Sequence, residues 1–469
     1  MRRGASLVWR RRSSGVREIP EDTVAGSQRE GQHQKPGWPP YLRRWEDLFC
    51  FQMASSFYRL LLFVGLWALI CCKPPSSSPS RGSPHPPYTK SSPISQVSSS
   101  STNFAFHLYR RLALQSPGQN IFFSPVSIST SLAMLSLGGH SATKAQILRT
   151  LGFNLTATPE SAIHQGFQHL VHAVNIPNKE LDLRMGSALF VKKGLQLQAS
   201  FLDRAKRLYG SKVFSMDFSE AFTAQRINRY VEKETKGKVM NLIQDLDPLT
   251  VMVLVNHILF KAKWMKPFNP ADTHKSFPFL VDEQTTVHVP MMQQMGTFAF
   301  GVDSKLNCSV LQMDFRGDAM AFFVLPGEGK MRQLEEKLSA RMLRKWSHSL
   351  QKRQIEVFIP KFSISASYDL ETILPKMGIR DAFSKNADFS GITKTGFLQV
   401  SKATHKAVLD IGEEGTKAVA ATATKLIVRS KDTPSSSAIT LNRPFLMFVV
   451  QEDRNAVLFM GKIENPTKA

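Results

Sequence analysis

A run of small residues near the C-terminus places the strongest constraint on what this chain can fold into. From Thr416 to Val428 the even-numbered positions carry no charge, and both lysines of the run, Lys417 and Lys425, occupy odd positions. Because successive side chains of a strand point to opposite faces, one face of this segment can enter a sheet without burying a charge. The run therefore combines a loop-like composition with the periodicity of a strand.

A basic peptide bond follows this run. Arg429-Ser430 joins an arginine to a small residue, which suits a trypsin-like protease because the guanidinium pairs with a carboxylate in the specificity pocket. Lys425-Leu426 and Lys431-Asp432 are weaker alternatives, the second because an acidic residue follows the lysine. The remaining alternative is an exposed basic loop with no such role.

Several segments resemble landmarks of a single family, the serpins. The hinge signature is Glu413-Glu414-Gly415-Thr416, and the C-terminal signature runs from Leu441 to Phe448. The other matching segments keep the family's order: Asn120 to Ser127, Leu254-Val255-Asn256, Lys263-Trp264 and Lys402 to Ala407. Asn154-Leu155-Thr156 and the stretch from Ile163 to Gln168 resemble the antitrypsin-like clade. The resemblance covers roughly Ser101 to Ala469.

The resemblance implies an α+β fold with three β-sheets, eight to nine helices and an exposed reactive-centre loop at about 412–440. It also implies a protease inhibitor rather than an enzyme, with a trypsin-like serine protease as its covalent partner. In the family the cleaved bond lies about fourteen residues beyond the hinge glycine, so Gly415 points to Arg429 and Ser430. A non-inhibitory carrier of a hormone or another ligand is the alternative on the same fold.

The hinge of this chain is small and free of proline as far as Pro434, whereas bulky, charged or proline-rich hinges mark many non-inhibitors. The resemblance gives the hinge role to Glu413, Gly415, Thr416, Ala418, Ala420 and Thr422. Asp314 aligns with a basic residue that pairs with the hinge glutamate in some relatives. We therefore expect Asp314 to repel Glu413 and to ease opening of the sheet.

A set of polar residues resembles the hydrogen-bonded latch behind the sheet where its strands part: Ser124, Ser127, Asn256, Trp264 and His405. A Ser/His set also invites a hydrolase interpretation, but the chain has no Gly-x-Ser-x-Gly elbow. It also has no His-Glu-x-x-His, Cys-x-x-Cys or phosphate-loop pattern. We expect no metal and no cofactor.

The chain is strongly basic, with a formal net charge of +23. Part of this charge falls on one side of a helical wheel, opposite Leu343 and Trp346. The residues concerned are Lys337, Arg341, Arg344, Lys345, His348 and Lys352. The pattern resembles the basic helix of a heparin-binding serpin and predicts a site for sulfated glycosaminoglycans, with a solvated helix face as the alternative. We expect a monomer and no nucleic-acid partner.

The N-terminal region is typical of a secretory precursor. Thirteen apolar residues from Leu60 to Cys72 suit a signal-peptide core and are short for a membrane span, which needs about 20. We therefore expect an N-terminal extension of doubtful status at 1–52, a signal peptide at 53–72, a Ser/Pro-rich disordered leader at 73–101 and the main domain at 102–469. Translation from Met53 and secretion are the favoured interpretation; a signal-anchored or intracellular form is the alternative. The sequons at Asn154 and Asn307 fit the secretory route.

Periodicity predicts the main elements. Asn103 to Leu114 carries a helical apolar stripe with Thr102 as its cap, and Ser127 to Leu137 is typical of a buried helix. Short apolar runs predict strands at 251–260, 319–325, 446–450 and 457–460. Cys308 is the one cysteine after the signal segment, so no disulfide framework holds the domain.

Overall fold

The computed structural model describes residues 93–176, 178–416, 437–451 and 456–468. Tyr88–Ala469 forms one compact unit. The predicted extension, signal peptide and scissile bond lie outside the described residues, and so do the hinge positions Ala418, Ala420 and Thr422.

Nine α-helices lie in the described part of the chain: α2 (Pro93–Gln115), α3 (Pro125–Ser136), α4 (Ser141–Thr150), α5 (Glu160–Val174), α6 (Ala199–Tyr209), α7 (Thr223–Glu234), α8 (Met331–Lys337), α9 (Ala340–Ser349) and α10 (Leu370–Met377). The strands in the same part are β1 (Ile121–Phe123), β2 (Leu181–Lys192), β3 (Lys212–Met216), β4 (Met252–Ala262), β5 (His274–Leu280), β6 (Thr286–Asp303), β7 (Cys308–Asp314), β8 (Ala319–Pro326), β9 (Gln351–Pro360), β10 (Phe362–Asp369), β11 (Lys402–Ile411), β12 (Ala438–Thr440), β13 (Phe445–Gln451) and β14 (Ala456–Ile463). Helices fill the first half and strands dominate the last third, which confirms the α+β class.

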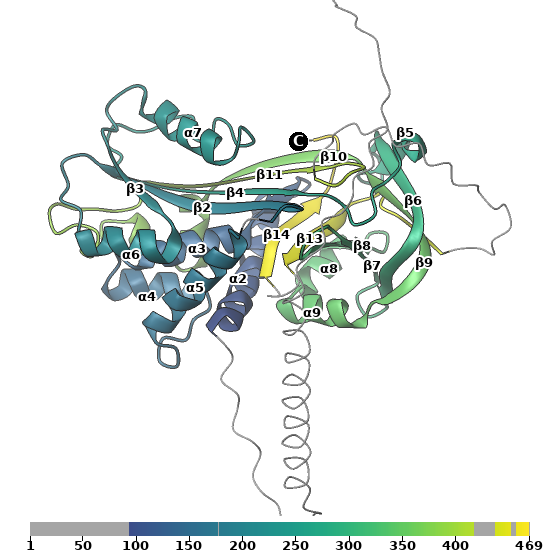
Figure 1. Cartoon of the computed structure of the whole chain (residues 1–469), viewed down its shortest axis with the longest axis horizontal. Helices are drawn as coiled ribbons and strands as arrows, with labels where there is room; N and C mark the ends of the chain where they lie inside the picture. The colour runs from purple at the N-terminus through teal and green to yellow at the C-terminus, as the bar shows by residue number, and fades with distance from the viewer. Residues whose placement is uncertain (1–92, 177, 417–436, 452–455, 469) are drawn as a thin grey trace, which may run out of the picture. The chain divides into compact units, whose positions relative to one another are not determined.

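The predicted buried helix is α3, and every one of its residues is buried. Ser124 is its N-cap and accepts a hydrogen bond from the backbone N–H of Ser127, while Pro125 occupies the first helical position. Its Ser, Thr and Ala side chains are small enough for a helix to lie against both a sheet and other helices. Figure 1 shows α3 beneath the five-stranded sheet.

The start of α2 differs from the prediction, because the helix begins at Pro93, within the leader expected to be disordered. Val97 is buried and lies against Gly166 of α5, where any Cβ would come within 2.6 Å of the valine side chain. Ser101 meets Ser129 of α3 in a hydrogen bond of 2.8 Å. The serine-rich composition that predicts disorder thus supplies the small side chains that close helix packing needs.

Thr102 is a mid-helix residue of α2 and not its cap. Its hydroxyl donates a hydrogen bond of 2.8 Å to the carbonyl oxygen of Ser98, one turn earlier. Such back-bonding satisfies a threonine hydroxyl inside a helix. The predicted cap is therefore wrong, although the apolar stripe of the predicted helix is buried, as at Phe104 and Leu108.

The five-stranded sheet has the order β10-β11-β4-β2-β3. On β4, Val253 and Val255 face a small core with Ile227 and Val231 of α7, whereas Leu254 faces the main core. Figure 1 accordingly shows α7 on one face of this sheet and α3 to α6 on the other. The central strands are thus covered on both faces, as their nearly continuous apolar sequence requires.

The other strands form one nine-stranded sheet, with the order β1-β14-β13-β8-β7-β6-β9-β12 and β5 paired to β6. The family resemblance implies three sheets, but hydrogen bonding joins the described strands into two. The reason is the length of β6, which pairs with β5 near its start, with β9 along its middle and with β7 at its end.

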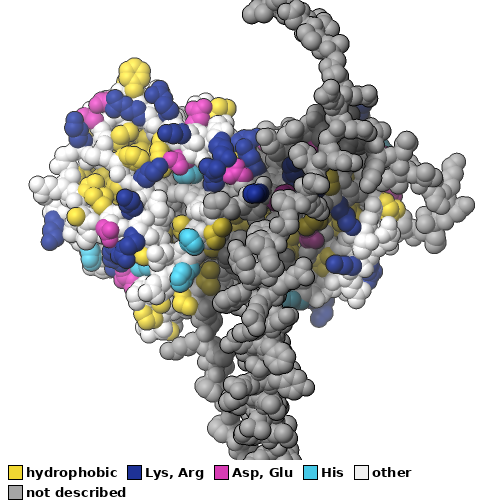
Figure 2. Space-filling model, viewed as in Figure 1, with side chains coloured by type: hydrophobic (Ala, Val, Ile, Leu, Met, Phe, Trp, Pro, Cys, Tyr) yellow, Lys and Arg dark blue, Asp and Glu magenta, His cyan; other side chains and the backbone are white. Residues whose placement is uncertain are grey.

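Lys and Arg side chains are spread over the face of the molecule drawn in Figure 2, with Asp or Glu beside several of them.

Candidate functional site

The two central strands of the five-stranded sheet are paired over only part of their length. β4 and β11 run parallel, and their register covers five residue pairs, from Lys402 with Val253 to Lys406 with His257. Beyond His257, β4 continues to Ala262 and is paired with β2 alone in the described part of the chain. β11 likewise continues to Ile411 beside β10. The seam between β4 and β11, as we name it, is therefore closed at one end and open at the other.

A segment that follows α7 lies across the seam. Lys238 forms an ion pair of 2.5 Å with Asp410 of β11. Lys406, also on β11, donates a hydrogen bond of 2.9 Å to the carbonyl oxygen of Met240. Both contacts hold the segment over β11, one of the two strands that border the seam.

The hinge sequence enters the open end of the seam. Thr416 is 2% exposed, and its backbone N–H donates to the carbonyl oxygen of Ala262 at 2.8 Å. The Thr416 hydroxyl accepts a hydrogen bond of 2.6 Å from the N–H of the same alanine. The first residue of the alternating run is thus already joined to the edge of β4, and its side chain is buried.

Gly415 makes this entry sterically possible. Its φ of 135° lies in the region that favours glycine. A Cβ at this position would overlap the carbonyl oxygen of Ala262, and it would come within 2.9 Å of the Trp264 nitrogen. The backbone of Trp264 donates to the carbonyl oxygen of Glu414 at 2.8 Å, which fixes the turn from the other side.

Glu413 has a cationic partner that the sequence alignment misses. Its carboxylate lies 2.9 Å from the Lys361 ammonium and also accepts a hydrogen bond from the Thr273 hydroxyl. Burial raises the pKa of Glu413, but the hydrogen bond and charge of Lys361 outweigh it and leave the pKa below its usual value. Asp314 instead accepts a hydrogen bond from the side chain of Gln312. Lys361 therefore compensates the charge of Glu413, and the expected easing of sheet opening by Asp314 stays a prediction.

A buried polar cluster lies at the closed end of the seam. His405 of β11 is fully buried, and its Nε2 accepts a hydrogen bond of 3.0 Å from the backbone N–H of Ser124. Its Nδ1 bonds to the Asn256 side-chain oxygen, and the Asn256 amide donates to Ser131 at 3.1 Å. Ser127 reaches the backbone of the next residue of β4, His257, at 3.5 Å. α3, β4 and β11 are thus tied together where the strands are paired.

The same geometry excludes the hydrolase interpretation. Desolvation by burial lowers the pKa of His405 to about 3, so the ring is neutral at physiological pH. Its Nε2 lone pair is occupied by the N–H of Ser124, so it has no free position from which to deprotonate a serine hydroxyl. His405 is a hydrogen-bonded core residue.

The structure adds one residue to the predicted latch and removes another. Sequence reasoning missed Ser131, which lies one helical turn after Ser127 on α3; an i, i+4 search along that helix finds it. Trp264 lies eight residues beyond Asn256, about 25 Å away along extended chain. Its indole donates to the carbonyl oxygen of Gly412 and its ring stacks on Phe315 at 4.2 Å. Trp264 therefore belongs to the hinge end of the seam.

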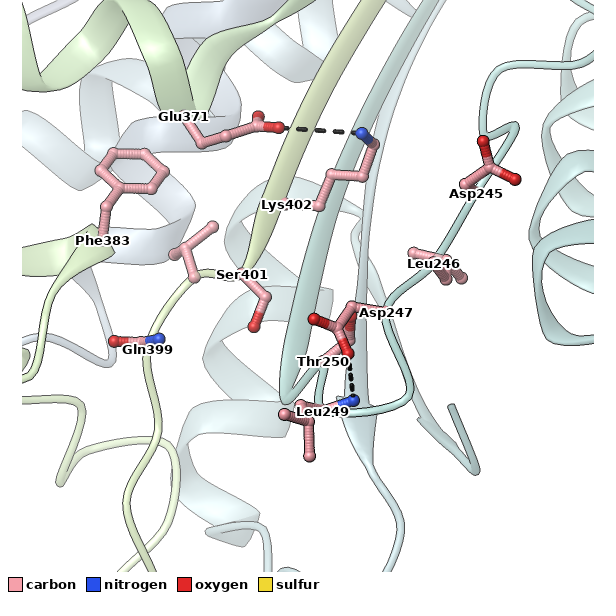
Figure 3. A pocket seen from close by; sticks show the side chains of 11 residues that line it. Asp245, Leu246, Asp247, Leu249, Thr250, Glu371, Phe383, Gln399, Ser401 and Lys402 are labelled. Carbon is pink, nitrogen blue, oxygen red and sulfur yellow. Dashed lines mark hydrogen bonds and ion pairs between the residues drawn. The ribbon is translucent and has the colours of Figure 1, made fainter. Parts of the chain in front are cut away.

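A cavity of about 470 Å³ lies where β4 and β11 begin. Figure 3 shows Glu371 directed at Lys402, and the two are 3.8 Å apart. Asp245 and Asp247 line another part of it, and the Asp247 carboxylate accepts a hydrogen bond from the backbone of Leu249. The described residues that line the cavity include no histidine and no cysteine, so they offer no imidazole or thiolate as a metal ligand.

The predicted basic helix is α9, with Leu343 and Trp346 buried beneath it. The basic residues are exposed as expected: Lys337 at the end of α8, Arg341, Arg344 and Lys345 on α9, and Lys352 on β9. Lys345 differs from the others because its ammonium lies 2.8 Å from the buried carboxylate of Asp303. It therefore has a structural partner as well as an exposed position.

Both sequon asparagines are exposed. The Asn154 side-chain oxygen accepts hydrogen bonds from the backbone and the hydroxyl of Thr156, so the third sequon residue folds back on the first. Asn307 lies in a turn with a φ of 49°, just before the buried Cys308. Burial raises the pKa of the Cys308 thiol to about 12, which keeps it protonated.

Within the described ranges, no helix combines the length and the apolar character that a membrane crossing requires.

Comparison with known proteins agrees with this geometry. The family described as "Serpin (serine protease inhibitor)" matches residues 99–466. Human Serpin A9 (centerin), a member of the antitrypsin-like clade, is 68% identical over 89% of this chain and 100% of its own length. Rat thyroxine-binding globulin is 50% identical over 89% of this chain and 100% of its own. The crystal structure of human thyroxine-binding globulin with thyroxine has a TM-score of 0.77 and 50% identity, and the match covers 80% of this chain and 99% of that one. The chain belongs to the serpin family.

Proposed function

We propose that this protein is a secreted inhibitor of trypsin-like serine proteases and acts on them as a suicide substrate. The observation that carries the proposal is the half-open seam. β4 and β11 share five residue pairs and then part, and Thr416 is already bonded to Ala262 at the open end. A strand supplied by the chain itself can complete this sheet.

The protease supplies the chemistry. Its serine attacks the carbonyl carbon of Arg429, the bond to the Ser430 nitrogen breaks, and Arg429 remains as an acyl ester on the enzyme. The freed segment from Thr416 to Val428 then enters the seam. In the proposed insertion, its uncharged even positions face the core. The acylated protease is carried along with the end of the segment.

Hydrogen bonding is sufficient to drive this step. About a dozen residues gain strand neighbours on both sides, and each ladder hydrogen bond contributes about 0.5–1.5 kcal/mol net, so insertion releases on the order of 10 kcal/mol. That is comparable with the free energy of unfolding of a whole domain. The Lys238–Asp410 ion pair, which is partly exposed, is the smaller opposing contribution.

Mixing the protein with trypsin tests the proposal. We expect a complex that survives denaturing electrophoresis, and we expect Arg429→Ala to lose it while the fold is kept. Cleavage of the wild type without any complex contradicts inhibition. A separate measurement tests insertion, since protein nicked at this bond should melt at a clearly higher temperature than intact protein.

A carrier function is the second candidate. It is favoured by the likeness to thyroxine-binding globulin, whose crystal structure contains thyroxine. Against it, this chain has a small, proline-free hinge. Isothermal titration with thyroxine separates the two functions: a tight, stoichiometric complex together with simple cleavage by trypsin favours the carrier.

Sulfated glycosaminoglycans are a proposed second partner, at the exposed basic face of α9. Replacing Lys345 would leave the buried carboxylate of Asp303 without its cationic partner, so the cleaner test is Arg341→Ala with Arg344→Ala. We expect this double variant to elute from heparin resin at clearly lower salt. Lys192→Ala with Lys193→Ala removes the same charge from two exposed residues near the end of β2 and serves as the control. Equal shifts in both variants contradict a specific face.

Secretion is proposed from the apolar segment at 60–72 and from the exposed sequons. Mass spectrometry of the natural protein tests it through the mature N-terminus and the mass at Asn154 and Asn307. A mature chain that begins after the apolar segment and carries glycan supports the route. Retention of residues 1–72 without glycan contradicts it.

A further inference from the structure

A cavity of about 780 Å³ lies between α2, α4 and α10, and none of the residues that line it belongs to the seam, the hinge or the basic face of α9. Its lining is partly apolar. Phe104 of α2 is buried, Met377 of α10 is half-buried, and Leu114 at the end of α2 is 76% exposed. Leu114 is thus one of the most exposed large apolar side chains in the described part of the chain.

Three helices each bring an exposed cation to this cavity. Arg111 comes from α2, Arg149 from the last turn of α4 and Lys376 from the last turn of α10. None of these three side chains has a hydrogen-bond or ion-pair partner among the residues that the structure describes, and neither does the side chain of His107 beside them. The described lining contains no Asp or Glu.

The remaining cation of the lining is already engaged. Arg110 donates a hydrogen bond to the carbonyl oxygen of Leu338. This arginine therefore ties α2 to the α8–α9 connection, whereas the three unpartnered cations have no such structural contact. The distinction separates a charge that holds the fold from charges that are free to meet a ligand.

Helix ends explain part of this pattern. A basic residue in a last turn stabilises a helix, which accounts for Arg149 and Lys376. It does not account for Arg111, which is neither in the last turn of α2 nor paired, or for the lack of a carboxylate. The two helix C-termini each contribute about half a negative charge, which leaves the rim positive beside three full cations. Other surface lysines, such as Lys144 with Glu160, have acidic partners, as is visible at several places in Figure 2.

We propose that this cavity binds a small amphipathic anion, in which one sulfate, carboxylate or phosphate group is joined to an apolar body. The guanidinium groups of Arg111 and Arg149 present paired donors to such an oxyanion, and Lys376 adds a third charge. Phe104 and Met377 offer an apolar surface to the rest of the molecule. The volume lies within the usual range of small-ligand sites, roughly 300–1,000 Å³. The proposal is independent of protease inhibition.

Titration calorimetry of the full chain with naphthalene-2-sulfonate tests both halves of the ligand. Inorganic sulfate carries the anion alone, and 2-naphthol carries the apolar body without a charge at neutral pH. We expect the sulfonate to bind at one site, at least ten-fold more tightly than either partial probe. If sulfate binds as tightly as the sulfonate, the cavity is a site for inorganic anions. If 2-naphthol binds as tightly, the cavity is an apolar pocket without charge recognition. Each result overturns the proposal.

Arg149→Gln with Lys376→Gln locates the site, since both side chains are exposed and their replacement leaves the core intact. We expect the dissociation constant for naphthalene-2-sulfonate to rise at least ten-fold. Lys192→Gln with Lys193→Gln carries the same loss of charge elsewhere, and its affinity should stay within two-fold of the wild type. Equal losses in the two double variants mean a general charge effect and overturn the proposal.

Leu114→Gln provides an independent test of the apolar wall of the cavity. Because Leu114 is exposed, its replacement should not disturb folding, so weaker binding by this variant is not explained by misfolding. We expect weaker binding of the sulfonate, by about three-fold or more, with the weak binding of sulfate unchanged. A different result would be binding of a heparin tetrasaccharide that depends on Arg149 and Lys376, without any binding of the sulfonate. That result would indicate a polysaccharide-binding surface and would contradict the small-ligand proposal.

Discussion

The two ends of the seam between β4 and β11 differ in how they are held. At the closed end, five residue pairs join the strands, and a fully buried cluster around His405 and Asn256 ties them to α3. At the open end the described contact with β4 is made by the hinge itself, through Thr416 and Ala262. The same sheet is therefore fixed at one end and incomplete at the other.

In the proposed mechanism, this difference is the source of metastability. A buried, satisfied polar network specifies one arrangement, because each partner that is lost leaves another without a hydrogen bond. The open end has unused strand edges, and the chain carries a segment with the pattern to fill them. We propose that folding stops short of the most stable sheet and that cleavage of the Arg429–Ser430 bond releases the segment that completes it.

The largest expected effect comes from blocking the open end. Thr416→Arg places a charge where the side chain is 2% exposed, and an unpaired buried charge is strongly unfavourable. We expect trypsin to cleave this variant, with the yield of covalent complex at least ten-fold lower. Thr286→Arg, the same change at an exposed strand residue, is the control and should keep the wild-type yield. An undiminished yield from Thr416→Arg contradicts the insertion register.

A second prediction weakens the closed end. Asn256→Ala leaves the Nδ1 of the buried His405 ring without a partner. It also removes one hydrogen bond from the Ser131 hydroxyl, which keeps its bond to the carbonyl oxygen of Ile128. Together these losses cost about 2–4 kcal/mol. For a domain of this size, we expect the melting temperature to fall by about 3–5 °C. Asn178→Ala, at an exposed turn, should melt within about 2 °C of the wild type. Similar melting of both variants means that the cluster does not hold the closed end.

Acid should destabilise the closed end of the seam through His257, the last residue of β4 that pairs with β11. Burial lowers the pKa of His257 to about 4, from 6.5 in the unfolded chain, although Glu234 opposes the shift. The unfolded state binds the extra proton between these values, so stability is lost as the pH falls from 6.5 towards 4. At pH 5 the loss from this residue is about 2 kcal/mol.

His257→Phe isolates that contribution. The Nδ1 of His257 has no hydrogen-bond partner in the described structure, so an apolar ring removes no bond there. Between pH 7.5 and 5, we expect the melting temperature of the variant to fall by about 3 °C less than that of the wild type. His348→Phe, at an exposed residue, should follow the wild-type curve. Parallel curves for all three proteins exclude His257 as a source of acid sensitivity.

The smallest effect is expected at the entrance to the hinge. Lys361→Gln removes the ion pair with Glu413, and the lysine is 40% exposed, so the loss is about 0.5 kcal/mol. We expect a melting temperature about 1–2 °C lower at low salt, with the difference shrinking in 1 M salt. Lys385→Gln, at an exposed residue outside the seam, should leave the melting temperature unchanged. A salt-independent difference would mean that packing of the lysine stem, rather than its charge, matters.

Local sequence patterns predicted much of this molecule. Apolar runs located β4, β8, β13 and β14, and the alternating run from Thr416 placed its first residue on the buried face. Family motifs brought Ser124, Asn256 and His405 together as the structure has them. Composition failed at α2, where serines that normally favour disorder form a tightly packed helix surface.

The sequence by itself determined several of the helices and strands, the family to which the chain belongs and the segment that we propose to change from loop to strand. These properties depend on the order of neighbouring residues. Only the tertiary structure decided that Lys361, 52 residues from Glu413, compensates it, that Trp264 lies at the hinge end, and that three cations from separate helices share one cavity. Such contacts depend on how segments that are far apart in the sequence pack against each other, and a local sequence pattern does not specify that packing.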